Sequence, residues 1–156
     1  ITEFRIPAAK VYLSPVIDCY DGMVVAYSTS TSPSAELANS MLMSAVSTLK
    51  PGERPVIHSD RGGHYRWPEW VRICEDSGLV RSMSKKGCSP DNSACEGFFG
   101  RMKVEMFYGE RWAGWTTSDF MDEIDEYIRW YNGSRIKKSL GGKSPIEYRE
   151  EGVNAA

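Results

Sequence analysis

The sequence has few of the residues from which zinc sites and disulfide frameworks are built. It contains four cysteines and two histidines, and no two cysteines have the C-x2-C spacing of a zinc ribbon. This spacing argues against a zinc ribbon, and the scarcity of histidine gives no support to a histidine-based metal site. Disulfides stay open as an alternative, but reduced thiols in a cytosolic protein are favoured, with Cys74 and Cys95 as small buried residues on helices.

Long apolar runs and a charge excess of one sign are also missing. No run approaches the roughly 20 residues of a membrane-spanning helix, and residues 1–10 have no signal-peptide pattern. The 19 Lys and Arg residues against 21 Asp and Glu residues give a net charge of −2, which excludes a wholly basic coat protein and a polyacidic tail. We therefore expect a cytoplasmic protein without a membrane partner, with one domain over residues 1–152 and a disordered tail at 153–156.

The hydrophobic periodicity predicts an α/β fold. Alternating or continuous apolar residues predict strands at 1–6, 11–18 and 23–30, with a hairpin turn at Asp21-Gly22. Helical spacing and stop signals then predict helices at about 32–50, 68–77, 92–107 and 117–133, and short strands at 55–59 and 79–84. This order predicts a mixed five-stranded sheet, three antiparallel strands followed by two parallel ones, with helices on both faces.

Asp60 directly follows the strand expected at 55–59 and precedes Arg61-Gly62-Gly63. In α/β sheets, ligands and chemistry gather at the carboxyl ends of strands, and glycines allow a close approach to the backbone. Asp60 is therefore a candidate site residue. Taken alone, the more ordinary interpretation is that it starts a turn or caps the next helix.

Glu96 lies in the first turns of the helix expected at 92–107. Gly100 and Lys103 follow it at i+4 and i+7 and share its face. A DNA backbone could lie along such a face, with Gly100 admitting close approach and Lys103 meeting a phosphate. An ordinary solvated face is the alternative. The neighbouring core stripe is expected to consist of Cys95, Phe99, Met102 and Met106.

Asp60 and Glu96 are more informative as a pair. Two carboxylates on separate elements, with 35 residues between them, would bind a hard cation such as Mg²⁺ if the fold brings them together. Two such ions about 3.5–4 Å apart stabilise both the attacking and the leaving oxygen in phosphoryl transfer. Two ions usually need a third carboxylate as well. Asp60 and Glu96 are thus the candidate metal ligands and catalytic residues.

Four features, in this order, carry a family resemblance. They are HSDRGGHY at 58–65, the 35-residue interval, DNSACEGFFGRMKVE at 91–105, and YIRWYNGSRIKKSLGGKSPIEY at 127–148. Together they resemble the catalytic core of bacterial insertion-sequence transposases of the IS-three group, relatives of retroviral integrases, essentially from end to end. The resemblance implies an RNase H-like fold, a metal triad of two aspartates and one glutamate, and DNA cleavage at transposon ends followed by strand transfer.

The resemblance also implies cofactors and partners. These are two Mg²⁺ or Mn²⁺ ions, the DNA of transposon ends and target, and further copies of the chain in an oligomer on that DNA. The family's first aspartate would fall immediately before Ile1, so we expect this chain to supply two of three metal-binding carboxylates, to bind Mg²⁺ weakly and to cut DNA poorly or not at all. Asp18, near the Asp21-Gly22 turn, is expected to be turn structure.

Several basic residues are candidates for DNA binding. In the family, the loop that matches the one before Glu96 touches DNA near the cut. Residues 129–149 hold six bases and one acid beside Trp130 and Tyr131, whereas residues 119–126 hold five acids and no base. A solvated loop or helix end is the alternative for each candidate. The candidates are Lys85, Lys86, His64, Arg101, Lys103, Arg135, Lys137 and Lys138.

Other interpretations stay open. A DNA-binding or assembly module that does not catalyse would fit an absent first aspartate. An RNase H-like nuclease acting on RNA–DNA hybrids is a third possibility, although the WYN and SP segments resemble transposases instead. Trp112 and Trp115 are expected to pack on the core, with a partner surface as the alternative.

Overall fold

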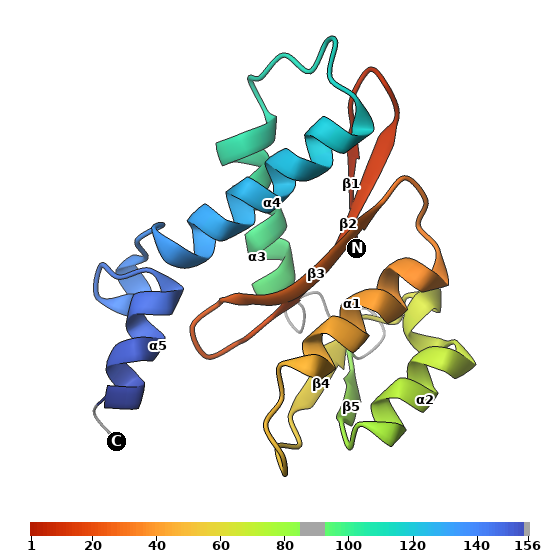
Figure 1. Ribbon diagram of the computed structural model, residues 1–156, viewed down its shortest axis with the longest axis vertical. Coiled ribbons are helices and arrows are strands. Elements are labelled where there is room, and N and C mark those ends of the chain that lie inside the picture. Colours follow the sequence, from red (N-terminus) through yellow and green to blue (C-terminus); the bar gives the residue numbers. More distant parts are fainter. Residues whose placement is uncertain (85–92, 155–156) are drawn as a thin grey trace.

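A three-stranded meander is followed by alternating helices and strands (Figure 1). The computed structural model describes residues 1–84 and 93–154, except for the side chains of residues 153 and 154. The strands are β1 (Thr2–Arg5), β2 (Lys10–Ile17), β3 (Val24–Ser30), β4 (Val56–Ser59) and β5 (Val80–Met83). The helices are α1 (Ala35–Ser47), α2 (Pro68–Asp76), α3 (Ser93–Met102), α4 (Thr117–Gly133) and α5 (Pro145–Asn154).

The five strands form hydrogen bonds in two sets. β1, β2 and β3 are antiparallel in that order, and β4 pairs in parallel with β5. The predicted three antiparallel and two parallel strands are confirmed. Within the described residues, however, no ladder joins β1 to β4. The four residues of β1 all pair with β2, from Thr2 opposite Leu13 to Arg5 opposite Lys10. β2 therefore has only β3 beside it beyond Leu13.

β2 is covered on both faces, as its nearly continuous apolar sequence predicts. Val11 and Leu13 belong to a core formed with α3 and α4, whereas Val16 packs against α1 and α2. The β2–β3 register shifts between Val16 and Ile17, directly after Pro15, which cannot donate an N–H to the ladder. Helices thus lie on both faces of the sheet.

Phe98, Met102 and Met106 seat α3 on the sheet. These three side chains are buried beside Phe4 of β1 and Phe120 of α4. The predicted stripe is therefore rotated slightly, because Phe98 replaces Cys95 and Phe99 at its centre. Cys95 and Phe99 are half-buried instead. The second core, between α1 and α2, consists of Ala38, Met41, Leu42, Trp70 and Cys74.

The predicted helix over 92–107 changes pitch before it ends. After α3, residues Lys103–Phe107 form a π-helical turn, η3, closed by the Tyr108 N–H donating to the Lys103 carbonyl at 2.7 Å. Glu105 lies in this widened turn and contacts α4, because the Tyr127 hydroxyl donates to the Glu105 carboxylate at 2.8 Å. Arg135 forms an ion pair with the same carboxylate at 2.5 Å. This contact ties the end of α3 to α4.

Side-chain caps explain where several helices begin. Ser34 caps α1, because its hydroxyl accepts the Leu37 N–H. Sequence periodicity missed α5, which begins with a reciprocal cap between Ser144 and Glu147. Since α5 extends to Asn154, the predicted tail at 153–156 is helical for its first two residues, and residues 155–156 lie outside the described part.

No helix among the described residues is long and apolar enough to cross a bilayer.

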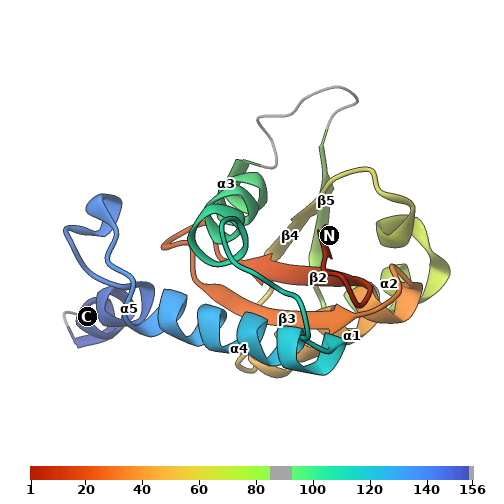
Figure 2. The ribbon, with the colours of Figure 1, turned by 90° about the horizontal axis from the view of Figure 1, so that it is seen from above.

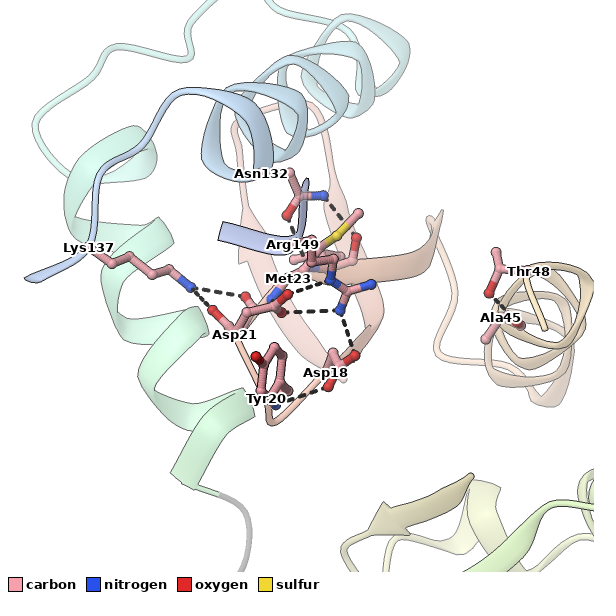
Figure 3. A network of polar contacts seen from close by, with 11 residues as sticks. Asp18, Tyr20, Asp21, Met23, Ala45, Thr48, Asn132, Lys137 and Arg149 are labelled. Carbon is pink, nitrogen blue, oxygen red and sulfur yellow. Dashed lines mark hydrogen bonds and ion pairs between the residues drawn. The ribbon is translucent and has the colours of Figure 1, made fainter. Parts of the chain in front are cut away.

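The C-terminal third is fastened to the β2–β3 hairpin by polar side chains (Figure 3). Buried Asn132 accepts the Val24 N–H at 3.0 Å and donates to the Val24 carbonyl at 2.9 Å, so it acts as a strand partner for β3. Arg149 of α5 forms ion pairs with Asp18 and Asp21. Lys137 donates to the carbonyl of Asp21 at 3.0 Å.

Replacing Asn132 with alanine is expected to destabilise the protein by about 2–3 kcal/mol, because it leaves a buried N–H and a buried carbonyl of Val24 without partners. Urea denaturation followed by circular dichroism measures the change. Ser134→Ala, at the exposed end of the same helix, is the control and should change stability by less than about 0.5 kcal/mol. Equal effects of the two substitutions would contradict the role assigned to Asn132.

Candidate active site

Asp60 lies in a tight turn directly after β4. Its Oδ1 accepts the Gly62 N–H at 2.7 Å, so the turn interpretation of this residue is realised. A Cβ atom on Gly62 would lie 2.8 Å from that same oxygen, whereas a Cβ atom on Gly63 would meet nothing within 4 Å. Gly62 is therefore the glycine that the turn requires. The turn holds one carboxylate oxygen and leaves Oδ2 without a hydrogen bond among the described residues.

Asp60 and Cys95 influence each other electrostatically. Burial raises the pKa of the Cys95 thiol, and the negative charges of Asp60 and Glu96 raise it further. Cys95 directly precedes Glu96 in the first turn of α3. The end of β4 therefore lies near the first turn of α3, with Asp60 close enough to act on Cys95.

Tyr65 belongs to the same neighbourhood. Burial, and then the charge of Asp60, raise the pKa of its phenol to about 12. Its ring also lies 3.5 Å from the position of a Cβ on Gly62. Nothing in the sequence marks Tyr65 except its place five residues after Asp60. The phenol keeps its proton at neutral pH and forms an apolar wall beside the carboxylate.

A cavity of about 890 Å³ opens between the two sets of strands. Its walls include Val16 of β2, Ile57 of β4 and Phe99 of α3, and Ile1, Asp60 and Cys95 also line it. The chain's first residue lies between β2 and the β4–β5 pair (Figure 2). Asp60 is thus at the border of a hollow, partly apolar space, and so is Cys95, the residue before Glu96.

The outer face of α3 is open, as the sequence predicts. Glu96 and Gly100 are exposed, and a Cβ on either Gly97 or Gly100 would meet nothing within 4 Å. Lys103 is only half-exposed, because its ammonium lies 5.6 Å from the centre of the Phe4 ring. The glycines leave room for a bulky ligand beside Glu96, and Lys103 borders that room above β1.

The donor set fits a hard divalent cation in kind. Asp60 and Glu96 offer carboxylate oxygens, which Mg²⁺ and Mn²⁺ prefer. In residues 1–84 and 93–154, no three His, Cys, Asp or Glu side chains gather closely enough to hold a metal ion. Asp60 and Glu96 are therefore candidate ligands for such an ion, as the sequence predicts.

Asp18 serves the hairpin turn (Figure 3). Its carboxylate accepts the Tyr20 N–H at 2.9 Å and pairs with Arg149 at 2.5 Å. These contacts use both oxygens in holding α5 against the hairpin. The interpretation of Asp18 as turn structure agrees with this geometry.

The predicted DNA-binding residues are not gathered on one surface. Arg135 pairs with Glu105, and Lys137 donates to the carbonyls of Asp21 and Gly22 at 3.0 and 3.1 Å. Burial also lowers the pKa of Lys137. Both cations therefore serve internal contacts.

Other candidates keep outward positions. Arg101 and Lys138 are exposed. His64 is half-buried beside Trp67, with ring centres 4.8 Å apart. Lys85 and Lys86 lie outside the described residues.

His58 has a role that sequence reasoning missed. It is exposed, and its ring nitrogens lie 2.9 Å and 3.0 Å from the hydroxyls of Ser82 and Ser84. Arg61 also donates to the Ser84 carbonyl at 2.9 Å. These bonds fasten β5 to the Asp60 turn. The H-x-D spacing was the available signal, because alternate strand residues share a face.

Comparison with known proteins identifies the family. A family model described as "Integrase core domain" matches residues 1–89, and a second one with the same description matches residues 96–152. A probable transposase for insertion sequence element IS1353 of Shigella flexneri is 64% identical over 96% of this chain. The putative transposase InsK for element IS150 of Escherichia coli is 42% identical over 97%. The chain spans 29% and 53% of the lengths of these two relatives.

The wider comparisons agree. Transposase InsF for insertion sequence IS3A of Escherichia coli is 32% identical over 98% of this chain and 53% of its own length. The magnesium-bound catalytic core domain of HTLV-2 integrase, in its trimeric form, has a similar fold, with a TM-score of 0.68 at 16% identity over 94% of this chain and 90% of that one. The chain therefore belongs to the integrase core domain family, beside the transposases of bacterial insertion sequences.

Proposed function

We propose that this chain is the catalytic core of a DDE-type transposase, which cleaves DNA at transposon ends and joins the freed ends to a target. The observation that supports this proposal best is the position of Asp60, held in a turn at the border of the cavity near Cys95, the residue that directly precedes Glu96 on the open face of α3. Two carboxylates on separate elements and an unobstructed surface are what a metal-dependent phosphodiester reaction requires.

Asp60 and Glu96 would hold Mg²⁺ or Mn²⁺, two ions in the complete site, and the metal would supply charge stabilisation at the reacting phosphate. The turn through Gly62 keeps Asp60 in place through its Oδ1. Cys95 and Tyr65 remain protonated, so they present little charge next to the two carboxylates. The protein's own contribution is thus one fixed carboxylate, Asp60, and one exposed carboxylate, Glu96.

The reaction has two steps with the same chemistry. Water first attacks a phosphorus atom at the transposon end, and the bond to the 3′-oxygen breaks to give a free 3′-hydroxyl. That hydroxyl then attacks a target phosphodiester and displaces the 3′-oxygen of the target strand. No side chain becomes covalently linked in either step.

DNA is proposed to lie along the outer face of α3. Gly97 and Gly100 leave space there, and Lys103 and Arg101 border it with positive charge. We also propose a homo-oligomer on DNA, acting in the bacterial cytoplasm. The HTLV-2 integrase core has been solved in dimeric and trimeric forms, which supports this proposal by analogy of fold.

Asp60→Asn and Glu96→Gln are each expected to reduce strand transfer on the order of 1,000-fold, because the loss of one ligand removes several kcal/mol of transition-state stabilisation. The assay joins an end-labelled transposon-end duplex to a target plasmid in Mg²⁺ or Mn²⁺, using the complete natural protein. Asp122→Asn on exposed α4 is the matched control. If the Asp60 and Glu96 variants keep full activity, the assignment is wrong. If the unaltered protein binds DNA but never cleaves it, the non-catalytic assembly module is the better interpretation.

Gly62→Ala is expected to weaken Mn²⁺ binding about 10-fold or more, since the new Cβ displaces the Asp60 carboxylate that it would otherwise meet at 2.8 Å. Gly63→Ala adds the same atom in open space. Electron paramagnetic resonance of Mn²⁺ measures both affinities, and circular dichroism verifies folding. If the two variants bind Mn²⁺ with equal affinity, Asp60 is not a metal ligand.

A further inference from the structure

A second depression, of about 510 Å³, lies at the opposite end of α3 from Glu96. Glu105, at its border, follows Glu96 by nine positions, a rise of about 13 Å at α-helical pitch. It is formed between the segment after η3 and the outer face of α4. We call it the Trp130 groove. The residues that matter for its chemistry are Glu110, Trp115, Glu123, Glu126, Tyr127 and Trp130.

Aromatic rings give the groove a firm base and one exposed wall. Trp112 is fixed beneath it, because its indole N–H donates to the Phe107 carbonyl at 3.1 Å and its ring stacks on Phe107. Trp115 packs edge-on against Trp112, with ring centres 5.0 Å apart. Trp130 is 46% exposed and lies beside Tyr127, with ring centres 5.6 Å apart. Trp130 thus offers an open aromatic face that the fold itself does not cover.

Carboxylates surround these rings. Glu110, Glu123 and Glu126 line the groove, and none of them takes part in an ion pair among the described residues. Arg111 is the one base in the lining. Glu105 also borders the groove, but its charge is matched by Arg135. The groove therefore has an excess of negative charge next to aromatic faces.

This combination selects for a cationic ligand. A guanidinium is attracted to the face of a tryptophan and can pair with a carboxylate through two N–H groups at once. Glu123 and Glu126, at i and i+3, lie on the same side of α4. Nucleic acid is disfavoured, because its phosphates would meet these carboxylates. A purely apolar partner would have to desolvate them.

We propose that the Trp130 groove binds an arginine-bearing basic peptide segment of a partner protein. An arginine side chain lies over Trp130 and pairs with Glu123 and Glu126. The two ends of α3 then have different partners, with DNA at the Glu96 end and a basic polypeptide at the other. This assignment rests on the groove alone and does not depend on catalysis at Asp60 and Glu96.

The test measures binding of a short capped peptide rich in arginine to the protein, by calorimetry and by tryptophan fluorescence. The double variant Glu123→Gln with Glu126→Gln, and separately Trp130→Ala, should each weaken binding about 10-fold or more. The control, Asp122→Asn with Glu150→Gln, removes the same charge outside the groove and should stay within about 2-fold. The same peptide with citrulline in place of arginine should bind at least about 10-fold more weakly.

Three results would overturn the proposal. The first is that the unaltered protein does not bind the arginine peptide. The second is that the control double variant weakens binding as much as the groove double variant, which would show that only the net charge of the protein matters. The third is that sedimentation shows a dimer of this chain that the groove variants dissociate and the peptide does not compete with, which would assign the groove to a second copy. Circular dichroism establishes that each variant is folded.

Discussion

The seating of α3 on the β1–β2 sheet is the interaction on which the rest of the molecule depends. Phe98, Met102 and Met106 are buried against the sheet and α4, and their burial removes several apolar side chains from water at about 1.5–3 kcal/mol each. Because these residues fix the rotation of the helix, they also fix which residues face outward. Glu96 and Gly100 are left exposed, and Cys95 is turned toward Asp60 and the cavity.

The candidate site combines one rigid carboxylate with one exposed carboxylate. Asp60 is held in its turn by the Gly62 N–H and walled by Tyr65, while Glu96 stands on the first turns of α3 with no hydrogen-bond partner among the described residues. A ligand that both residues share must therefore approach from the cavity side or along the helix face.

Sequence reasoning located the elements well and the polar contacts poorly. Periodicity identified β2 as a strand, and it placed Asp60 directly after β4 and Glu96 in the first turn of α3. It could do so because the spacing of apolar residues reflects which side chains are buried. It did not predict that Arg135 and Lys137 face inward. The sequence shows where a basic residue stands but not whether its partner is a carboxylate or carbonyl of the protein or a phosphate of DNA. Nor did it predict the pairing of Asn132 with Val24, whose partners are 108 residues apart.

The net charge of −2 is the sum of basic and acidic residues that lie in different parts of the fold. Much of the basic C-terminal stretch is neutralised within the fold, because Arg149 pairs with Asp18 and Asp21 and Arg135 pairs with Glu105. The acids of α4 have no such partners in the described ion pairs, so their charge remains on the surface. A polyanion would therefore be repelled from α4 and would approach the glycine-rich face of α3 instead. In the proposed function, the uncompensated acids of α4 thus help to direct DNA to the face of α3.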